Sequence, residues 1–365
     1  MSGLNGINGI NGINGINGIN GINGINGING INGINGINGI NGINGINGIG
    51  GGFPVGDTLT AGAGIRHAAG FEPIDPATIK DDDTRNDAQM GLWSAQVRAW
   101  LYVTEFTKNL SHVDTASSLT MRWNGKAMLT LDRPDIPLLC TQLKYLFDYM
   151  DQRPERGGEV VGQMGALADY YGFILGLTPS RHPKTTELID TVQNLCSHAV
   201  MVPKHNLCIR RPDQLDGRIM PMIPTPGHGS FPSGHATQSM AIATILEALV
   251  RAKPDHFGDV EARVKLLYKQ AERIAGNRTV AGVHYPIDSW AGASLGREVA
   301  RIVHAAATAK GNRSATLKAQ RYTPVHHDYL MPDFQAADQD AGGTYKVARS
   351  GPIAWLWEKA LAEFI

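Results

Sequence analysis

The chain has 365 residues with 33 basic and 33 acidic side chains, and therefore no formal net charge. Nucleic-acid-binding proteins usually carry a basic excess, so this balance argues against that class. No run of 18 or more apolar residues occurs, which excludes a typical membrane-spanning helix. Three cysteines without CxxC spacing argue against a disulfide framework or a zinc site.

Residues 1–52 are predicted to be a low-complexity leader. Fifteen copies of Asn-Gly-Ile run from Asn5 to Ile49, and three glycines follow. A period of three matches neither a strand nor an α-helix, and Asn and Gly disfavour both. Collagen also has glycine at every third position, but this tract has no proline. We therefore expect a flexible leader, with an ordered assembly element as the alternative.

The leader also bears on localisation and assembly. It has no basic segment followed by a continuous apolar run, so no secretory signal is predicted. We expect a soluble protein whose compartment is open, with the cytoplasm favoured. Identical tracts on several chains could pair through backbone and Asn amides, so a homo-oligomer is one expectation.

The folded part, residues 53–365, is interpreted as a single all-α domain, a helical bundle, although its length alone would also allow two small domains. Apolar residues recur at helical spacing in eight segments. In chain order these predicted helices are 86–110, 135–152, 158–177, 184–201, 236–252, 260–275, 286–307 and 353–364. One short strand is predicted at 127–131, and the polar residues 311–350 are expected to form a long surface segment.

Some local signals refine these helices. Asp135 is suited to cap the helix that follows it. The segment 236–252 is apolar nearly all round, which predicts a buried helix. Pro286 is a good first-turn residue for the helix 286–307. Small residues within that helix, among them Gly292 and Gly296, would let another helix approach closely.

Three segments concentrate chemistry-bearing residues, at 204–212, 232–235 and 278–288. In chain order they supply Lys204, Arg211, Ser233, Gly234, His235, Arg278, His284 and Asp288. This is the set that a tetrahedral oxyanion needs, because guanidinium groups bind oxygens in pairs and a lysine adds a point charge. A glycine at a helix start exposes backbone N–H groups where the helix dipole favours an anion. One histidine can bond the central atom while Asp288 holds its other ring nitrogen, and the second histidine can move protons.

The three segments resemble the three motifs of the superfamily of type 2 phosphatidic acid phosphatases and vanadium-dependent haloperoxidases. Those motifs are Lys, six residues, Arg-Pro; then Pro-Ser-Gly-His; then Arg, five residues, His, three residues, Asp. The chain matches each of them in spacing and order, over residues 204–288. The chain departs from the third motif at Asn277, which stands where that motif usually has serine. The resemblance implies an α-helical bundle, in agreement with the helical periodicity.

The resemblance also implies a role for each matching residue. The oxygens of phosphate or vanadate would be bound by Lys204, Arg211, Ser233, Gly234 and Arg278. His284 would be the phosphate-attacking nucleophile or the ligand of vanadium, His235 the acid–base residue, and Asp288 the residue that orients His284. Both chemistries fit one site because five-coordinate vanadate copies the geometry of phosphoryl transfer.

The choice between the two chemistries depends on residues outside the motifs. Membrane phosphatases of the family have spanning helices and its secreted acid phosphatases have signal peptides, and neither is visible in this sequence. His228 stands seven residues before His235, where the resemblance places histidine in brown-algal bromoperoxidases and phenylalanine in fungal chloroperoxidases. Met201, by contrast, stands three residues before Lys204, where both have tryptophan. We expect His228 to line the cavity beside the vanadate, although it could be an ordinary solvated loop residue.

The favoured interpretation is a vanadate-dependent haloperoxidase, a bromoperoxidase rather than a chloroperoxidase. Its implied cofactor is vanadate, and its small-molecule partners are hydrogen peroxide, a halide and an organic acceptor. In the implied reaction His235 accepts a proton from peroxide, Lys204 polarises it, and bromide attacks a peroxide oxygen to give a species such as hypobromous acid. The alternative is a soluble acid phosphatase that acts on phosphate esters through a phosphohistidine and needs no cofactor. A catalytically inactive assembly protein is a third hypothesis.

Overall fold

The computed structural model describes residues 75, 77, 87–165, 167–311 and 313–364. The leader and the domain boundary predicted at residue 52 lie outside these residues. The chain divides into one unit that ends at Trp100 and a second that begins at Leu101, and each is described by itself. In the first unit, the described residues form the 3-10 helix η4 (Asp87–Leu92) and the beginning of helix α5 (Ala95–Thr107).

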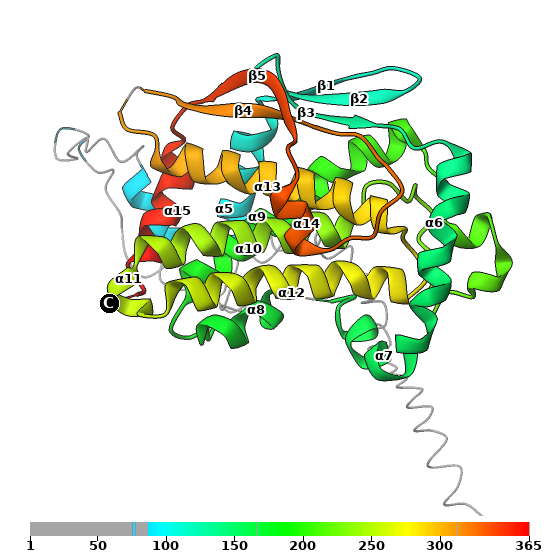
Figure 1. Ribbon diagram of the computed structural model, residues 1–365. Coiled ribbons are helices and arrows are strands. Elements are labelled where there is room, and N and C mark those ends of the chain that lie inside the picture. The colour runs from blue at the N-terminus through cyan, green and yellow to red at the C-terminus, as the bar shows by residue number, and fades with distance from the viewer. Residues whose placement is uncertain (1–74, 76, 78–86, 166, 312, 365) are drawn as a thin grey trace, which may run out of the picture. The chain divides into compact units, whose positions relative to one another are not determined.

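The second unit is mostly helical, as the sequence predicts. Its α-helices are α6 (Ile136–Asp148), α7 (Arg153–Gly162), α8 (Ala168–Leu175), α9 (Pro183–Leu207), α10 (Gly234–Ala252), α11 (Pro254–Phe257), α12 (Val260–Val280), α13 (Pro286–Thr308), α14 (Met331–Ala336) and α15 (Gly351–Leu361). Short 3-10 turns lie at η5 (Met150–Gln152), η6 (Pro212–Gln214) and η7 (Gly217–Ile219). Helices α9, α12 and α13 pack around α10, and Figure 1 shows these four helices running side by side. The predicted cap of α6 is also confirmed, since Leu138 N donates to Asp135 Oδ1 over 2.9 Å.

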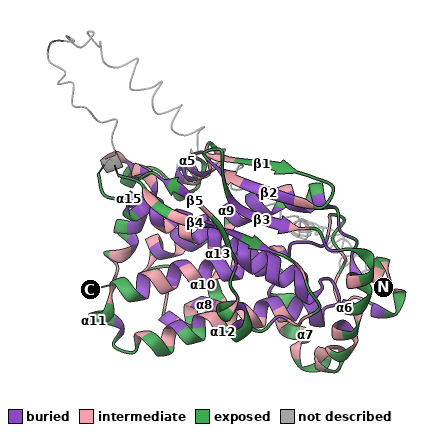
Figure 2. Ribbon diagram, turned by 45° about the horizontal axis from the view of Figure 1, so that its top comes forward, coloured by how far each residue is buried: buried purple, intermediate pink, exposed green. Residues whose placement is uncertain are grey.

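Helix α10 is the centre of the bundle. Eleven of its 19 residues are buried, and Figure 2 shows α10 and the neighbouring α13 in the colour of buried residues over most of their length. This confirms the prediction from the apolar character of residues 236–252. A helix that is apolar on nearly all sides needs neighbours on all sides, and here it has them.

Two glycines bring α13 close to α10. A Cβ atom on Gly292 would collide with the backbone oxygen of Ser233, and one on Gly296 would collide with the backbone oxygen of Thr237. The prediction that small residues on this helix permit a close approach is confirmed, and the approaching helix is α10. Because Ser233 begins α10, the same packing fixes the position of that helix's N-terminus.

We predict that Gly296→Ala destabilises the protein by about 1–3 kcal/mol, because the new methyl group overpacks the contact with α10. Gly276→Ala is the matched control. Gly276 also lies inside a helix, but the nearest heavy atom to a Cβ built there is Arg156 Nη1 at 3.8 Å. That substitution should stabilise the protein by about 0.5–1 kcal/mol, since alanine favours helix over glycine. Urea unfolding measures the change in the free energy of unfolding for each variant. Equal changes in the two variants would contradict the packing argument.

A five-stranded sheet departs from the all-α expectation. Its strands are β1 (Leu110–Asp114), β2 (Ser118–Trp123), β3 (Lys126–Asp132), β4 (Ala315–Tyr322) and β5 (Asp340–Val347), in that order across the sheet. β3 and β4 are parallel and the other neighbours are antiparallel. The strand predicted at 127–131 is thus confirmed as β3. The expectation that residues 311–350 form a long surface segment is wrong, because β4, α14 and β5 lie within this range.

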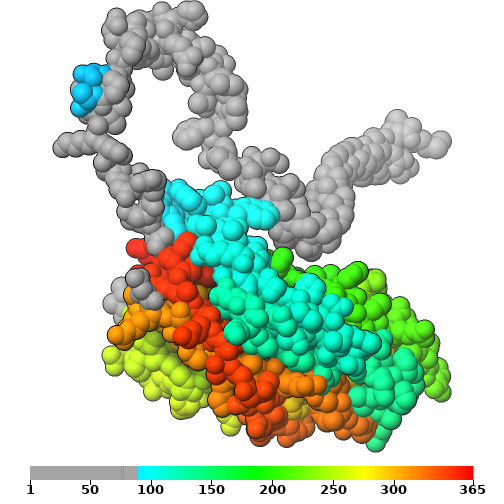
Figure 3. Space-filling model, turned by 90° about the horizontal axis from the view of Figure 1, so that it is seen from above, coloured from blue at the N-terminus to red at the C-terminus, as the bar shows by residue number. Residues whose placement is uncertain are grey.

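The sheet joins two parts of the chain that are far apart in sequence. Leu129 in β3 is paired with Gln320 in β4, and Figure 3 shows the teal residues of the first three strands beside the orange and red residues of the last two. Buried and partly exposed residues alternate along β2, so one face of the sheet is covered. Strands β3 and β4 contact α13, and Figure 1 shows the sheet lying along that helix.

The helix predicted at 158–177 is interrupted. Helix α7 ends at Gly162 with Gln163 as its C-cap, and α8 begins only at Ala168. The break leaves the backbone carbonyl of Gln163 without a helical partner, and this carbonyl instead accepts a hydrogen bond from His235. The sequence motifs gave no indication of this contact.

Candidate active site

The three motif segments meet at the ends of four helices. Lys204 lies in the last turn of α9, Ser233 caps the N-terminus of α10, Arg278 lies in the last turn of α12, and Asp288 lies in the first turn of α13. The positive charges of Arg211, Lys204 and Arg278 all lower the pKa of His284, so these side chains lie near it. The residues that the sequence groups by motif are therefore neighbours in space.

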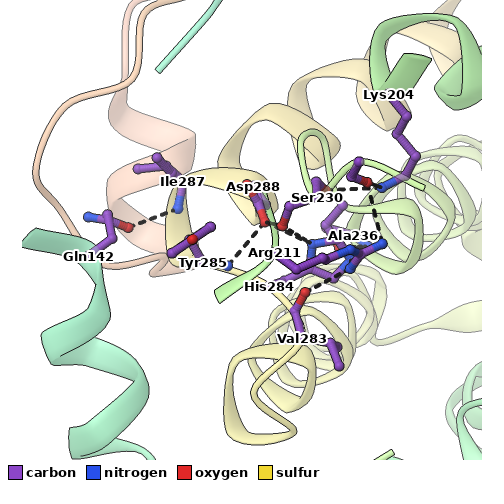
Figure 4. A network of polar contacts seen from close by, with 12 residues as sticks. Gln142, Lys204, Arg211, Ser230, Ala236, Val283, His284, Tyr285, Ile287 and Asp288 are labelled. Atoms are coloured by element: carbon purple, nitrogen blue, oxygen red, sulfur yellow. Dashed lines mark hydrogen bonds and ion pairs between the residues drawn. The ribbon is translucent and has the colours of Figure 1, made fainter. Parts of the chain in front are cut away.

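His284 is held in one tautomer by the groups on its two sides. Its Nδ1 lies 2.8 Å from Asp288 Oδ2, and its Nε2 lies 3.1 Å from Arg211 Nη1 (Figure 4). A carboxylate accepts and a guanidinium donates, so the proton must be on Nδ1 and the lone pair on Nε2. Burial lowers the pKa of His284 well below its usual value, and the neighbouring Arg211 lowers it further. The ring is thus neutral, with an unprotonated Nε2.

Asp288 is fixed from several directions. Besides His284, it accepts hydrogen bonds from the Ser230 hydroxyl and from Tyr285 N, which lies 3.1 Å away. Burial raises the pKa of its carboxyl group, while Ser230 and Lys204 oppose that rise. Ser230 was missed by the sequence analysis. It lies only three residues before Ser233, so its place in the same loop was the available signal.

Arg211 is buried and oriented by backbone oxygens. Its Nε donates to His228 O over 3.1 Å, and its Nη1 donates to Val283 O over 2.7 Å. These contacts direct the guanidinium toward His284, as Figure 4 shows. A ligand atom bonded to His284 Nε2 would take the place of the present contact with Arg211 Nη1 and would receive the same donor.

Lys204 is a buried amine, and none of the carboxylates in the described part of the chain forms an ion pair with it. Its Nζ donates to Gly229 O over 2.9 Å and to Ser230 O over 3.0 Å. Burial lowers the pKa of Lys204, and the positive charge of Arg211 lowers it further. A bound anion would raise the pKa of Lys204 again, because it would compensate the buried positive charge.

The N-terminus of α10 provides backbone donors. Ser233 caps the helix through a hydrogen bond from Ala236 N to its hydroxyl, 3.4 Å long. A side chain on Gly234 would meet no heavy atom within 4 Å, so the first turn is open on that side. Open N–H groups at a helix N-terminus favour a negatively charged ligand.

His235, in that first turn, carries its proton on Nε2. This atom lies 2.8 Å from Gln163 O, and a carbonyl can only accept. Burial lowers the pKa of His235 to about 3, with a further contribution from Arg278. His235 is therefore a neutral imidazole close to a cationic group, and a nearby anion would raise its proton affinity.

Arg278 has hydrogen-bonding capacity that the protein does not use. Its Nη2 donates to Val160 O and to Gln163 Oε1, at 2.9 and 3.0 Å. Its Nε and Nη1 are buried and have no hydrogen-bond partner among the residues that the structure describes. Burial lowers the pKa of Arg278 to about 10. Unpaired donors on a buried cation are costly, and an oxyanion is the kind of ligand that would satisfy them. The donor set therefore fits phosphate or vanadate.

His228 lies in the loop before α10 and contacts Arg211. The Nδ1 atom of His228 is 3.1 Å from Arg211 Nη2, while the side chain as a whole is exposed. Partial desolvation lowers the pKa of His228, and Lys204 lowers it further. The ring thus lies between the buried cations and solvent.

Asn277, which replaces the usual serine of the third motif, connects two helices. Its Nδ2 donates to Glu159 Oε2 over 2.9 Å and to Gln163 Oε1 over 3.1 Å, both from the end of α7. A serine hydroxyl is shorter and could not donate to two acceptors at once. Gln163 itself contacts His235 and Arg278 and was not predicted by any motif.

Comparison with known proteins agrees with the motif region. Residues 188–311 match the model of the PAP2 superfamily. All the site residues predicted from the sequence lie inside that match. Residues 1–53 match the model of the collagen triple helix repeat, 20 copies. Comparison with curated proteins gave no match.

Two solved structures are among those similar to this chain. One is a transmembrane PAP2-type phosphatidylglycerolphosphate phosphatase from Bacillus subtilis, with 19% identity and a TM-score of 0.38, covering 47% of this chain and 86% of that one. The other is a bacterial vanadium-dependent iodoperoxidase, with 16% identity and a TM-score of 0.33, covering 44% of this chain and 46% of that one. This chain therefore spans less than half of the iodoperoxidase. Among the residues described in this protein, no helix combines the length and the apolar character needed to cross a membrane.

Proposed function

We propose that this protein is a vanadate-dependent haloperoxidase that oxidises halide, bromide above all, with hydrogen peroxide. The observation that carries the proposal is Arg278, a buried guanidinium with two unpartnered nitrogen donors. It is supported by the neutral His284, whose unprotonated Nε2 is the kind of atom that binds vanadium. An organic acceptor for the oxidised halogen is the third small-molecule partner in this proposal.

The protein's own groups would divide the work as follows. The positive charges of Lys204, Arg211 and Arg278 offset the charge of the oxyanion, and the Ser233 hydroxyl and Gly234 N–H bind its oxygens. Asp288 keeps His284 Nε2 unprotonated by accepting the hydrogen bond from Nδ1–H, which holds the proton on that nitrogen. His235 takes a proton from peroxide and returns it to the departing oxygen. Vanadate, when bound, supplies a Lewis acid that makes peroxide an oxidant for halide.

The second candidate is a phosphatase that acts on phosphate esters. The neutral His284 favours it too, because an unprotonated Nε2 held by Asp288 is ready to attack phosphorus without any cofactor. In that reaction His235 would protonate the leaving oxygen of the ester and then activate water to hydrolyse the phosphohistidine.

One experiment separates the two candidates. Purified protein is incubated with vanadate, hydrogen peroxide, bromide and a brominatable acceptor, and in parallel with p-nitrophenyl phosphate and no vanadate. Halogenation that requires vanadate supports the haloperoxidase, whereas ester hydrolysis that vanadate inhibits supports the phosphatase. Failure of both assays, together with absence of phosphate binding by calorimetry, would overturn the oxyanion site itself.

We predict that His228→Ala keeps vanadate bound but alters the pH profile of bromide oxidation. The contacts of Arg278 and His284 do not involve His228, so vanadate affinity should change by less than about threefold. In the wild type, the rate should change as pH falls through the pKa of His228, which lies below the usual 6.5. The variant should lack that inflection. Identical profiles for wild type and variant would remove His228 from the argument for bromide.

A further inference from the structure

Gln163 lies outside the three motifs, yet it contacts two of their residues. It is fully buried at the end of α7. Its backbone oxygen accepts from His235 Nε2 over 2.8 Å, and its side-chain oxygen accepts from Arg278 Nη2 over 3.0 Å. Gln163 therefore helps to orient both His235, the candidate proton-transfer residue, and Arg278, the cation with unpartnered donors.

The carboxamide of Gln163 has one orientation. Its Oε1 accepts from Asn277 Nδ2 as well as from Arg278 Nη2, and neither of these groups can accept a hydrogen bond in return. The amide nitrogen must therefore be on the opposite side. That Nε2 atom is buried, and no described part of the chain gives it a hydrogen-bond partner.

Leaving such a donor unsatisfied is unfavourable, so a partner for it is expected in the working protein. The free Nε2 of Gln163 lies on the same carboxamide that contacts Arg278, and Arg278 also has free donors, Nε and Nη1. Three unpartnered N–H-bearing atoms on two residues in contact indicate an acceptor with several oxygens. A single backbone carbonyl would satisfy only one of them.

The end of α7 is held in place independently of these donors. Arg273 in α12 donates to Glu159 in α7 through Nε and Nη2, at 2.8 and 2.6 Å, and Asn277 Nδ2 donates to the same carboxylate. Glu159 is one helical turn before Gln163, so this ion pair positions the last turn of α7 against α12. Figure 1 shows the two helices beside each other.

We propose that Gln163 is an additional oxyanion-binding residue, which donates from Nε2 to the same bound vanadate or phosphate that Arg278 contacts. This rests on the proposed function only in that the site holds a tetrahedral oxyanion, and it applies equally to the haloperoxidase and the phosphatase. Gln163 extends the anion site from the PAP2-matched residues to α7. It also couples the anion to His235, because one residue contacts both.

The decisive variant is Gln163→Glu, measured by phosphate calorimetry at pH 8. The substitution keeps side-chain oxygens for Arg278 and Asn277, and it keeps the backbone oxygen for His235. It replaces the free donor with a negatively charged oxygen that faces the anion. We expect phosphate to bind about 100-fold more weakly than to the wild type. Gln163→Met removes the donor without adding charge, and it also removes the oxygen that Arg278 and Asn277 contact. It should weaken binding at least about tenfold and serves if the glutamate variant does not fold.

Glu155→Gln is the matched control. Glu155 lies on the same helix, but its side chain is exposed and its ion pair with Arg273 Nη2 is 3.8 Å long, so phosphate affinity should change by less than about threefold. A pH series gives a second readout. The ratio of wild-type to Gln163→Glu affinity should narrow at pH 5 relative to pH 8, because protonation removes the charge of the new glutamate.

The outcomes are distinct. If Gln163→Glu and Gln163→Met both bind phosphate within about threefold of the wild type, Gln163 is a structural residue and the inference is overturned. If wild type binds phosphate and the variants lose affinity, the inference stands even where bromide oxidation is absent and the haloperoxidase proposal fails. If the wild type binds neither phosphate nor vanadate, the proposed function and this inference are overturned together.

Discussion

Replacing His284 with alanine should lower turnover at least about 1000-fold, whether the reaction measured is bromide oxidation or ester hydrolysis. Among the described residues of the site, His284 has the one imidazole whose Nε2 is unprotonated, because its proton is on Nδ1, which donates to Asp288 Oδ2. His235 cannot substitute for it, since its Nε2 carries a proton that is donated to Gln163 O. The measurement is kcat under saturating substrate, with vanadate loading determined separately.

The matched control for this variant is His205→Ala. His205 is next to Lys204 in sequence but is exposed on α9. Its removal should leave turnover within about twofold of the wild type. Turnover by His284→Ala at a rate close to that of the control would show that the reacting atom is bound elsewhere, and the assignment of all three motifs would then be wrong.

The anion-binding residues could be predicted because their spacing is local. His284 and Asp288 are four residues apart around the start of α13, and Ser233 and Gly234 begin α10. At such short spacings, the cap and first turn of a helix determine how the side chains lie relative to one another. Caps and first turns have recognisable residue patterns in a sequence. The close approach at Gly292 was predictable on similar grounds, because a glycine inside a helix costs stability unless a neighbouring backbone needs the space.

The sheet could not be predicted because its pairing is not local. β3 and β4 are parallel neighbours, although Leu129 and its partner Gln320 are separated by most of the second unit. In β4, apolar residues do alternate with polar ones at Ala315, Leu317 and Ala319, and the expectation of a surface segment at 311–350 overlooked this strand signal. Alternation within one strand predicts the strand itself, but it does not predict that β4 pairs with β3.

The role of Gln163 could not be predicted for a different reason. A glutamine near the end of an apolar helical pattern has no motif spacing to the residues it contacts, which lie 72 and 115 positions later. The helix was expected to continue to residue 177, and this would have left the Gln163 carbonyl inside a helix. Only the break between α7 and α8 presents that carbonyl to His235.

The second large effect concerns Arg278, the cation with unused donors. Arg278→Lys keeps the charge, and an ammonium can still reach toward Val160 O and Gln163 Oε1, but it cannot supply the guanidinium's separate Nε and Nη1 donors. We expect phosphate and vanadate to bind about 100-fold more weakly. Arg273→Lys is the control, because Arg273 is on the same helix but is paired with Glu159. Its phosphate affinity should stay within about threefold of the wild type.

The same variant connects binding to stability. Phosphate at about 100 times its Kd should raise the free energy of unfolding of the wild type by about 2.7 kcal/mol, because it binds the folded state only. At that phosphate concentration Arg278→Lys should gain less than about 0.5 kcal/mol, since a 100-fold weaker site is only half occupied. Urea unfolding with and without phosphate measures the difference. An equal gain in wild type and Arg278→Lys would mean that phosphate stabilises the protein at another place, and the unpartnered donors of Arg278 would then not mark the anion site.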